Sequence, residues 1–253
     1  MSDSVHTPGA PDDAGSSVQR GLANVHERIA TAAARCGRDP ATVRLLAVSK
    51  RQSEQKIREA YAAGQRDFGE SYAQELVGKS SLAAELTGLR FHMIGHVQRN
   101  KCGALAGLVS AVHSVDSVRL ARELGRRAAL APVPAERRLL LGAELAVFVE
   151  VNLGSEAQKA GCSPAELPSV LAAVEDEPAL ALIGLMAIPE GEGEAEASRR
   201  AFQALAELRE RQGGARRLPE LSMGMSRDLE VAVECGTSWV RVGTDIFGAR
   251  ARA

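Results

Sequence analysis

The sequence lacks the signals that mark nucleic-acid-binding, membrane and secreted proteins. Its formal net charge is −1, and the charged residues are spread along all 253 positions instead of gathering in a basic patch. Nucleic acid and anionic membrane surfaces both attract such patches, so neither is an expected partner. No apolar run is long enough to cross a bilayer, and the polar first residues do not form a secretory signal. We therefore expect a soluble, cytoplasmic protein.

Cysteines are few and isolated. The four cysteines, Cys36, Cys102, Cys162 and Cys235, form no Cys-x-x-Cys pair and have no histidine at ligand spacing. Disulfide frameworks and zinc sites need cysteines at close or regular spacing, so both are disfavoured. We expect reduced thiols and no bound metal.

What the chain does contain is a regular alternation of short apolar runs and segments of helical periodicity. Residues 1–16 have the composition of a disordered tail, and a leading helix is predicted over residues 18–36. Strands are then predicted at residues 44–49, 67–69, 90–94, 112–115, 145–151, 180–185, 220–223 and 239–242. Helices are predicted at residues 54–63, 73–86, from about 98, 118–130, 164–174, 195–212 and 227–235, with a loop over 131–143.

Eight strands separated by helices favour a single (β/α)8 TIM barrel with an extra N-terminal helix. Residues 17–253 are expected to form this one domain, a length that suits the fold. The alternative is an open doubly wound sheet, which would require that one or two weak strands, such as residues 67–69, are not strands.

Lys50 follows the first apolar run and is the first candidate for chemistry. A primary amine where a buried strand opens into a loop lies in a partly dry site, where it is more easily kept neutral and able to attack a carbonyl. Taken alone, a lysine in this place is more often a solvated residue that marks the return to water.

Two glycine-containing segments, residues 221–226 and 239–244, have the composition of a phosphate site. Glycines let backbone N–H groups approach an anion, and serine or threonine hydroxyls complete its surroundings. Each segment alone fits a tight strand-to-helix turn equally well. In a barrel, however, both follow the last two strands, where phosphate sites are common, and the eighth strand lies beside the strand that leads to Lys50.

An amine and a phosphate site on one rim suggest pyridoxal 5′-phosphate held as an internal aldimine. A Schiff-base aldolase acting on a phosphorylated sugar is an alternative, because it would use the same lysine and the same phosphate site without a cofactor.

Six blocks of the sequence resemble the YggS/PROSC family of pyridoxal-phosphate-binding homeostasis proteins, which are similar to the barrel domain of alanine racemase. The blocks are LAVSK (46–50), DFGESYAQE (67–75), FHMIGHVQRNK (91–101), GLMAIP (184–189), LSMGMS (221–226) and VRVGTDIFG (240–248). They occur in family order and extend over nearly the whole chain.

The resemblance implies a role for seven residues. Lys50 is implied to form the Schiff base, and Arg241 to lie close to the pyridine nitrogen. The phosphate is implied to be held by Ser222, Gly224, Ser226, Gly243 and Thr244. A guanidinium beside the ring nitrogen disfavours its protonation, so the ring becomes a poorer electron sink. No catalytic residue and no metal ligand is implied.

The function implied by the resemblance is intracellular homeostasis of pyridoxal phosphate by a non-enzymatic carrier and buffer. Its partners would be the cofactor and pyridoxal-phosphate-dependent apoenzymes, and a monomer is expected. An amino-acid racemase-like enzyme is the alternative. Alanine racemases add a C-terminal β-domain that supplies a tyrosine base, and we expect none here because the chain ends at Ala253, just after the eighth unit.

The chain departs from the family at Ser71, where an asparagine is usual. The shorter hydroxyl leaves the family's contact with the cofactor open at this position, and a bridging water is the alternative. Lys159, on the predicted loop after the fifth strand, is a candidate for a second aldehyde-reactive amine, although an exposed loop lysine is the favoured interpretation. For His92 and His113 we expect roles in the core or at strand ends and not in catalysis.

Overall fold

The computed structural model describes residues 16–134, 144–154, 160–189 and 195–249. The predicted tail lies outside these residues except for Ser16, whose hydroxyl accepts a hydrogen bond from the Gln19 backbone N–H and so begins the first helix. Lys159 and most of the predicted loop over residues 131–143 also lie outside them.

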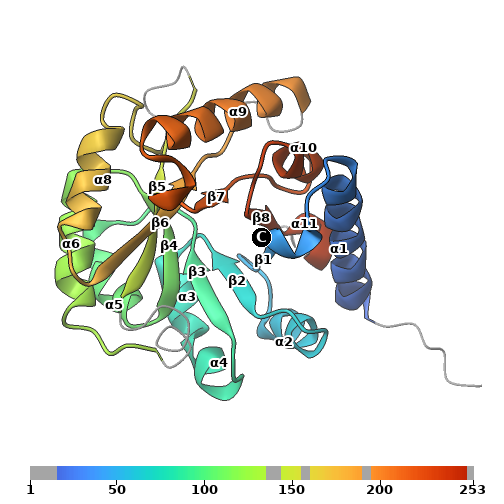
Figure 1. The fold of residues 1–253 in the computed structure, drawn as a ribbon. Coiled ribbons are helices and arrows are strands. Elements are labelled where there is room, and N and C mark those ends of the chain that lie inside the picture. The colour runs from blue at the N-terminus through green and yellow to red at the C-terminus, as the bar shows by residue number, and fades with distance from the viewer. Residues whose placement is uncertain (1–15, 135–143, 155–159, 190–194, 250–253) are drawn as a thin grey trace, which may run out of the picture.

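Eight parallel strands form a closed barrel in sequence order (Figure 1). The strands are β1 (Arg44–Val48), β2 (Asp67–Glu70), β3 (Arg90–Met93), β4 (Val109–Val115), β5 (Leu145–Glu150), β6 (Leu180–Met186), β7 (Glu220–Ser222) and β8 (Trp239–Val242). The predicted barrel is confirmed, and the open sheet is excluded because β1 pairs with β8, with Leu45 opposite Val240.

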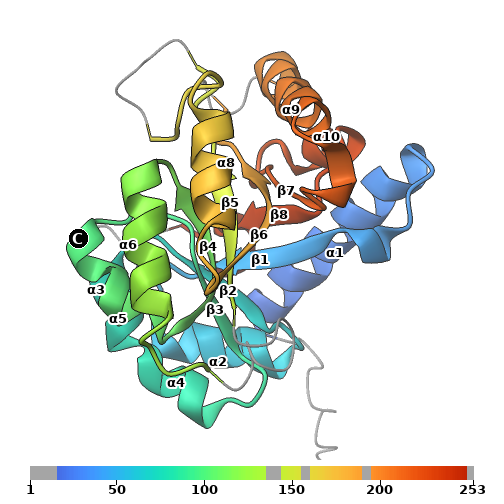
Figure 2. The same ribbon diagram turned by 60° about the vertical axis from the view of Figure 1, so that its left-hand side comes forward.

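Helices surround the barrel, and the view in Figure 2 shows α6 and α8 on the side of β4 to β6. The helices are α1 (Ser17–Arg35), α2 (Glu54–Ala62), α3 (Ala73–Gly78), α4 (Ser80–Glu85), α5 (Cys102–Ala106), α6 (Val118–Ala128), α8 (Leu167–Glu175), α9 (Ala195–Arg211), α10 (Leu229–Glu234) and α11 (Thr244–Phe247). Short 3-10 turns occur at Pro40–Thr42, Arg99–Lys101 and Gly214–Arg216.

Two predicted helices differ from the structure. The single helix expected over residues 73–86 is divided at Lys79, whose side chain is buried and whose amine bonds inward to Ser49 and Glu70. The helix expected from residue 98 begins as a 3-10 turn before α5. A further helix, α11, is a single turn that follows β8 directly and was not predicted from the sequence.

The leading helix α1 packs against the last two units of the barrel. Its buried stripe, which includes Leu22, Val25 and Ile29, contacts α10 and α11, and Figure 1 shows the three helices side by side. Gly21 permits this approach, because a Cβ on it would lie 2.6 Å from the backbone oxygen of Asp245. The helix therefore lies directly behind the loops that follow β7 and β8.

The barrel interior is separate from the core between strands and helices. Leu46, Phe148, Met186 and Trp239 form a small apolar cluster there. Side chains alternate along a strand, so Glu150 and Arg241, two residues after Phe148 and Trp239, also point inward. The interior is thus apolar near its middle and charged toward the ends of β5 and β8.

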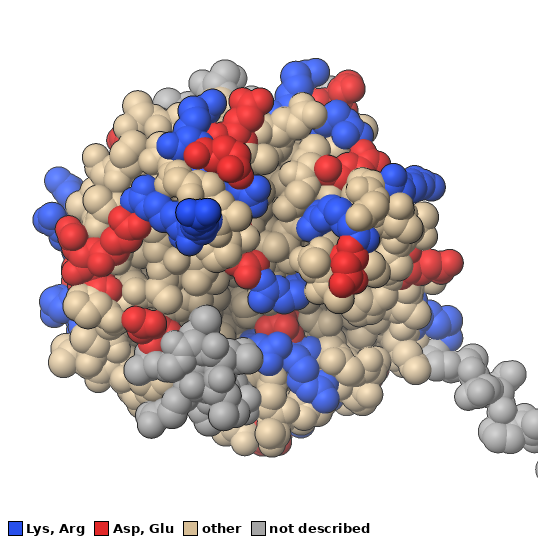
Figure 3. All heavy atoms as spheres, viewed as in Figure 1, with Lys and Arg blue, Asp and Glu red and all other residues tan. Residues whose placement is uncertain are grey.

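The outer surface carries both signs of charge. Figure 3 shows lysine and arginine interspersed with aspartate and glutamate over the face in view, in agreement with a formal net charge of −1. In the part of the chain that the structure describes, no helix is both long and apolar enough to span a membrane.

Candidate functional site

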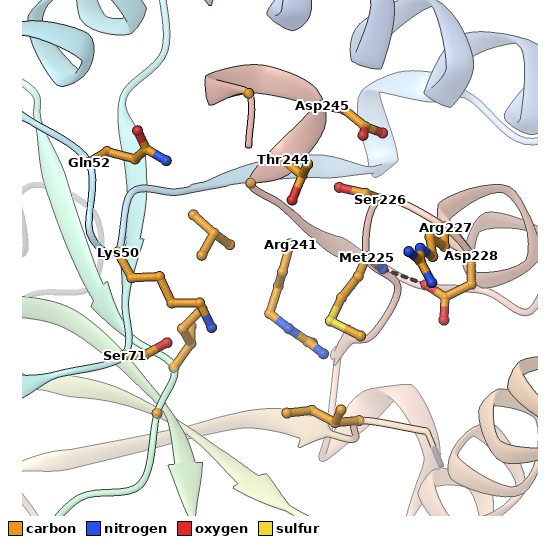
Figure 4. A pocket seen from close by; sticks show the side chains of 16 residues that line it. Lys50, Gln52, Ser71, Met225, Ser226, Arg227, Asp228, Arg241, Thr244 and Asp245 are labelled. Atoms are coloured by element: carbon orange, nitrogen blue, oxygen red, sulfur yellow. Dashed lines mark hydrogen bonds between the residues drawn. The ribbon is translucent and has the colours of Figure 1, made fainter. Parts of the chain in front are cut away.

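A cavity of about 450 Å³ lies at the ends of the strands, among the loops that follow β1, β2, β3, β7 and β8 (Figure 4). These loops and strand ends contribute Lys50, Gln52, Ser71, Ile94, Gly95, Met225, Ser226, Arg241, Gly243 and Thr244 to its lining. The C-terminal face of a TIM barrel is where such proteins build their active sites.

Five of the seven residues predicted from the sequence line this cavity: Lys50, Ser226, Arg241, Gly243 and Thr244. Figure 4 shows the Lys50 amine and the Arg241 guanidinium extending toward the same space, with the Thr244 and Ser226 side chains above Arg241. Residues far apart in sequence thus converge as the barrel topology requires. An amine, a cation and two hydroxyls therefore surround one cavity.

Ser222 and Gly224 do not line the cavity. Ser222 is fully buried at the end of β7, and its hydroxyl lies 2.9 Å from both Arg241 and His113. Gly224 has φ +95°, and a Cβ on it would lie 2.4 Å from the Ala232 Cβ. The Ser222 hydroxyl therefore bonds to side chains in the barrel interior. Gly224 provides a left-handed backbone conformation in the loop after β7.

Arg241 is only 4% exposed and is held by two hydrogen bonds. Its guanidinium donates to the Ser222 hydroxyl at 2.9 Å and to the Ala187 carbonyl oxygen at 3.0 Å. Burial lowers the pKa of Arg241 to about 10, while the negative charges of Glu150 and Asp228 act in the opposite direction. The group therefore stays cationic at neutral pH and points in a fixed direction.

A chain of hydrogen bonds continues from Arg241 through the barrel interior. His113 lies 2.9 Å from Ser222 and 3.0 Å from His92, which in turn lies 3.1 Å from Asp67. Arginine can only donate and a carboxylate can only accept, so one arrangement satisfies every member. The Ser222 hydroxyl donates to His113 Nδ1, His113 Nε2–H to His92 Nδ1, and His92 Nε2–H to Asp67.

The two ends of this chain carry opposite charges, with Arg241 at one end and Asp67 at the other. Burial lowers the pKa of His113 well below its ordinary value, and the neighbouring charges of His92 and Arg241 lower it further. Burial acts to raise the pKa of Asp67, but hydrogen bonds from His92 and Arg90 outweigh it and leave the pKa well below its usual range. Both histidines thus have the interior role that the sequence analysis expected.

Glu150 is a buried carboxyl group that the sequence analysis missed. Burial raises its pKa to about 7, the charge of Arg241 acts in the opposite direction, and Asp116 adds to the rise. The available signal was its position: it ends the apolar run of β5 in register with the inward-pointing Phe148. Glu150 is not among the residues that line the cavity.

The backbone on both sides of Lys50 is anchored by hydrogen bonds, and on one side these come from a buried ion pair. Lys79 donates to the Ser49 carbonyl oxygen at 2.8 Å and to Glu70 at 2.7 Å, and the Ser49 hydroxyl also donates to Glu70. On the other side, the Arg51 backbone N–H donates to Glu75, with Arg51 at φ +57°. The main chain at Lys50 is therefore held in one conformation.

Other polar residues near the rim differ in whether they reach the cavity. Ser71 lines the cavity, and its carbonyl oxygen packs against Gly95 of the next loop. His96 is exposed and pairs with Asp116 at 3.3 Å. All four cysteines are unpaired. Among the described residues, no group of three or more His, Cys, Asp or Glu side chains is arranged to hold a metal ion.

Comparisons with known proteins agree with this architecture. Residues 21–251 match the family model "Alanine racemase, N-terminal domain". The pyridoxal phosphate homeostasis protein of Pseudomonas aeruginosa is 46% identical, over 93% of this chain and 96% of that protein. The protein of the same name from Escherichia coli K12 is 42% identical, over 92% of this chain and 97% of that protein.

Solved structures show the same pattern. The structure of PipY from Synechococcus elongatus with pyridoxal phosphate bound has a TM-score of 0.75 and 35% identity, and the match covers 91% of this chain and all of PipY. Alanine racemase from Corynebacterium glutamicum has a TM-score of 0.62 at 15% identity, covering 94% of this chain but 62% of the racemase. The latter likeness shows the fold alone.

Glu150 gives a testable dependence of stability on pH. The folded state keeps a proton on Glu150 up to about pH 7, whereas the unfolded chain releases it near its ordinary pKa of 4.5. The contribution of Glu150 is therefore fully present below the lower value and is lost as the pH rises through the upper one. Compared with the native protein, Glu150→Gln should show an unfolding free energy that rises more steeply with pH in this window, by about 1.4 kcal/mol per pH unit.

Urea titrations at several pH values within and above this window measure the difference. Opposing contributions, such as that of His113, are present in both proteins and cancel. Glu207→Gln, which changes an exposed carboxylate on α9, is the matched control and should give a curve parallel to that of the native protein. A parallel curve for Glu150→Gln would show that Glu150 does not titrate in this range.

Proposed function

The chain belongs to the alanine racemase N-terminal-domain family, within its group of pyridoxal phosphate homeostasis proteins, and from this premise we propose that it binds pyridoxal 5′-phosphate as an intracellular carrier and buffer of that cofactor. The observation that carries the proposal is one cavity lined by Lys50, Arg241, Ser226, Gly243 and Thr244. Relatives of nearly equal length named for this homeostasis, and the PipY structure with the cofactor bound, support it.

The residues present fit the cofactor. Pyridoxal phosphate has an aldehyde, an anionic phosphate and an aromatic ring with a nitrogen atom. The cavity offers an amine at Lys50, hydroxyls at Ser226 and Thr244 and the bare backbone of Gly243. Arg241 adds a buried guanidinium. Each part of the ligand therefore has a complementary group in the lining.

When bound, pyridoxal phosphate supplies an aldehyde that an amine can capture reversibly and a ring that withdraws electrons. We assign the amine to Lys50, whose backbone is anchored by the contacts of Ser49 and Arg51. We assign the phosphate to Ser226, Gly243 and Thr244. Ser222 and Gly224 support this site indirectly, Ser222 by orienting Arg241 and Gly224 by setting the course of the β7 loop.

Arg241 is assigned to the ring nitrogen, and this assignment favours a carrier over an enzyme. Its cationic guanidinium disfavours a proton on that nitrogen, which weakens the ring as an electron sink. The carboxylates in the cavity lining already have partners: Asp228 accepts from the Met225 N–H, and Asp245 accepts from Arg28. Neither is available as a free base opposite Lys50, so an amino-acid racemase activity is not supported by the described lining.

The proposal also covers location, oligomeric state and partners. We propose that the protein is cytoplasmic and monomeric, and that pyridoxal-phosphate-dependent apoenzymes receive the cofactor from it. The exposed loop position of Lys159 remains a prediction from the sequence, with a second aldehyde-reactive amine as its alternative.

Replacement of Lys50 tests the covalent attachment. Protein purified with pyridoxal phosphate should show a visible absorbance band, and Lys50→Ala should lose it because no amine remains at that position. Borohydride reduction followed by peptide mapping should place the adduct on Lys50 of the native protein. Lys101→Ala, at a lysine outside the cavity lining, is the control and should keep the band. A reduced adduct on another lysine would contradict the assignment.

Thr244→Val tests the phosphate site, because it removes a hydroxyl and preserves the shape of the side chain. A hydrogen bond to a charged group is worth about 1.5 to 3 kcal/mol, so the affinity for pyridoxal phosphate should fall by about one to two orders of magnitude. The affinity for unphosphorylated pyridoxal should change little. Thr42→Val, at an exposed threonine that bonds to Asp39, is the control. Equal losses for both ligands would show that Thr244 does not contact phosphate.

The carrier assignment is tested by proton exchange. The holo-protein, incubated with common amino acids in deuterated water, should incorporate no appreciable deuterium at Cα. Arg241 weakens the electron sink, and neither carboxylate of the described cavity lining is a free base. Mass spectrometry of the recovered amino acids measures this. Rapid incorporation that Lys50→Ala abolishes would favour the racemase-like enzyme instead.

A further inference from the structure

Arg28, on the leading helix α1, joins the two loops assigned to the phosphate. Its guanidinium donates to the Ser226 carbonyl oxygen at 2.8 Å and to the Asp245 carboxylate at 2.5 Å. A third contact, at 2.7 Å, goes to Glu230 on α10. One side chain therefore links the loop after β7 and the first turn of α11 to the leading helix. Arg28 is 198 residues from Ser226 and 217 residues from Asp245 in the sequence.

This contact is part of a close packing arrangement. The α1 backbone approaches α11 at Gly21, where no side chain separates the two helices. The Arg28 side chain is 33% exposed, and the hydrogen bond with Glu230 raises its pKa in spite of partial burial. The guanidinium is thus always charged and is held between three acceptors on the outer side of the site.

The direction of the Ser226 carbonyl matters for anion binding. Arg28 is not among the residues that line the cavity, whereas Ser226 is. The Ser226 carbonyl oxygen, because it bonds to Arg28, is held away from the cavity and its partial negative charge does not face a bound phosphate. The Ser226 hydroxyl is shown beside Thr244 in Figure 4.

Charge provides a second effect. Asp245 lines the cavity, and an unpaired carboxylate in the wall of a phosphate site would repel the ligand. Arg28 pairs with that carboxylate and with Glu230 in the neighbouring helix. The extra N-terminal helix thus supplies the counter-charge for the acidic side chains around the site.

We propose that Arg28 is a positioning residue of the phosphate site, acting through the Ser226 backbone and the Asp245 carboxylate without touching the ligand. This inference rests on the proposed function, because it concerns the phosphate of the same cofactor. It assigns to α1 a role in ligand selectivity: the helix favours phosphorylated over unphosphorylated pyridoxal.

The main test compares ligand affinities in Arg28→Gln. The dissociation constant for pyridoxal phosphate should rise about tenfold, since the variant loses hydrogen bonds to charged groups and leaves Asp245 unpaired. The constant for pyridoxal should stay within about twofold, because pyridoxal carries no phosphate to be repelled. Titration of the full-length protein by absorbance gives both values.

Arg38→Gln is the matched control. Arg38 follows α1 and donates to the Val233 and Thr237 carbonyl oxygens at 2.6 and 2.8 Å, so it ties the same region of the chain to the unit around α10. It does not contact the two phosphate loops. Its loss should lower thermal stability in the same way but leave the ratio of the two affinities unchanged.

A second variant separates charge from general disruption. Asp245→Asn introduced into Arg28→Gln removes the unpaired carboxylate and should recover at least about threefold of the lost affinity for pyridoxal phosphate. Arg28→Lys keeps the charge and loses the branched geometry, so it should weaken binding by about threefold. It also provides the measurement if Arg28→Gln does not fold.

The outcomes distinguish the two proposals. A native protein that fails to bind pyridoxal phosphate would overturn the proposed function itself. Two results would overturn only the role of Arg28, provided that the native protein binds normally. One is an unchanged affinity ratio in Arg28→Gln and Arg28→Lys, and the other is the same change of the ratio in Arg38→Gln. A selective loss for the phosphorylated ligand that Asp245→Asn partly reverses would establish it.

Discussion

The pairing of β1 with β8 is the contact on which the whole site depends. Four residues of each strand lie in register, from Arg44 opposite Trp239 to Ala47 opposite Val242. This pairing closes the barrel and brings the loop that carries Lys50 beside the segment that carries Thr244, although the two residues are 194 positions apart in the sequence. It also leaves α1 next to α11, where Arg28 can reach Asp245. Without closure, the amine and the phosphate loops would belong to opposite edges of a sheet.

Closure also creates an interior that must accommodate charge. A buried guanidinium is costly unless its donors are bonded, and Arg241 meets this requirement through Ser222 and Ala187. The Ser222 hydroxyl in turn needs a hydrogen-bond acceptor, and His113, further inside the barrel, provides it. Ser222 and His113 thus meet the hydrogen-bonding needs that follow from burying Arg241 beside the cavity. They also fix the direction of the Arg241 guanidinium.

The parts of this structure that the sequence could predict are those encoded in local patterns. Alternating apolar runs and helical segments were sufficient for the barrel. The barrel then placed Lys50 on the same rim as the segments after the last two strands, and Lys50 does line the cavity. What could not be predicted depends on contacts between distant residues. The sequence did not indicate that the Ser222 hydroxyl accepts a hydrogen bond from Arg241. The break at Lys79 depends on Glu70, which lies on another element. Arg28 carries no local signal, because its acceptors are about 200 residues away.

These long-range contacts bear on the difference between holding a cofactor and using it. An amine and a phosphate site can anchor pyridoxal phosphate in either kind of protein, so they do not separate a carrier from an enzyme. The separation depends on what faces the ring: a proton on the ring nitrogen strengthens the electron sink, and a free base opposite the lysine moves the substrate proton. In the binding mode that we propose, Arg241 opposes protonation of the ring nitrogen. Among the described residues of the cavity, Asp228 accepts from the Met225 N–H and Asp245 from Arg28, so neither is a free base. The ion pair between Arg28 and Asp245, which we place in the surroundings of the phosphate, therefore also removes one carboxylate that could otherwise act as a base.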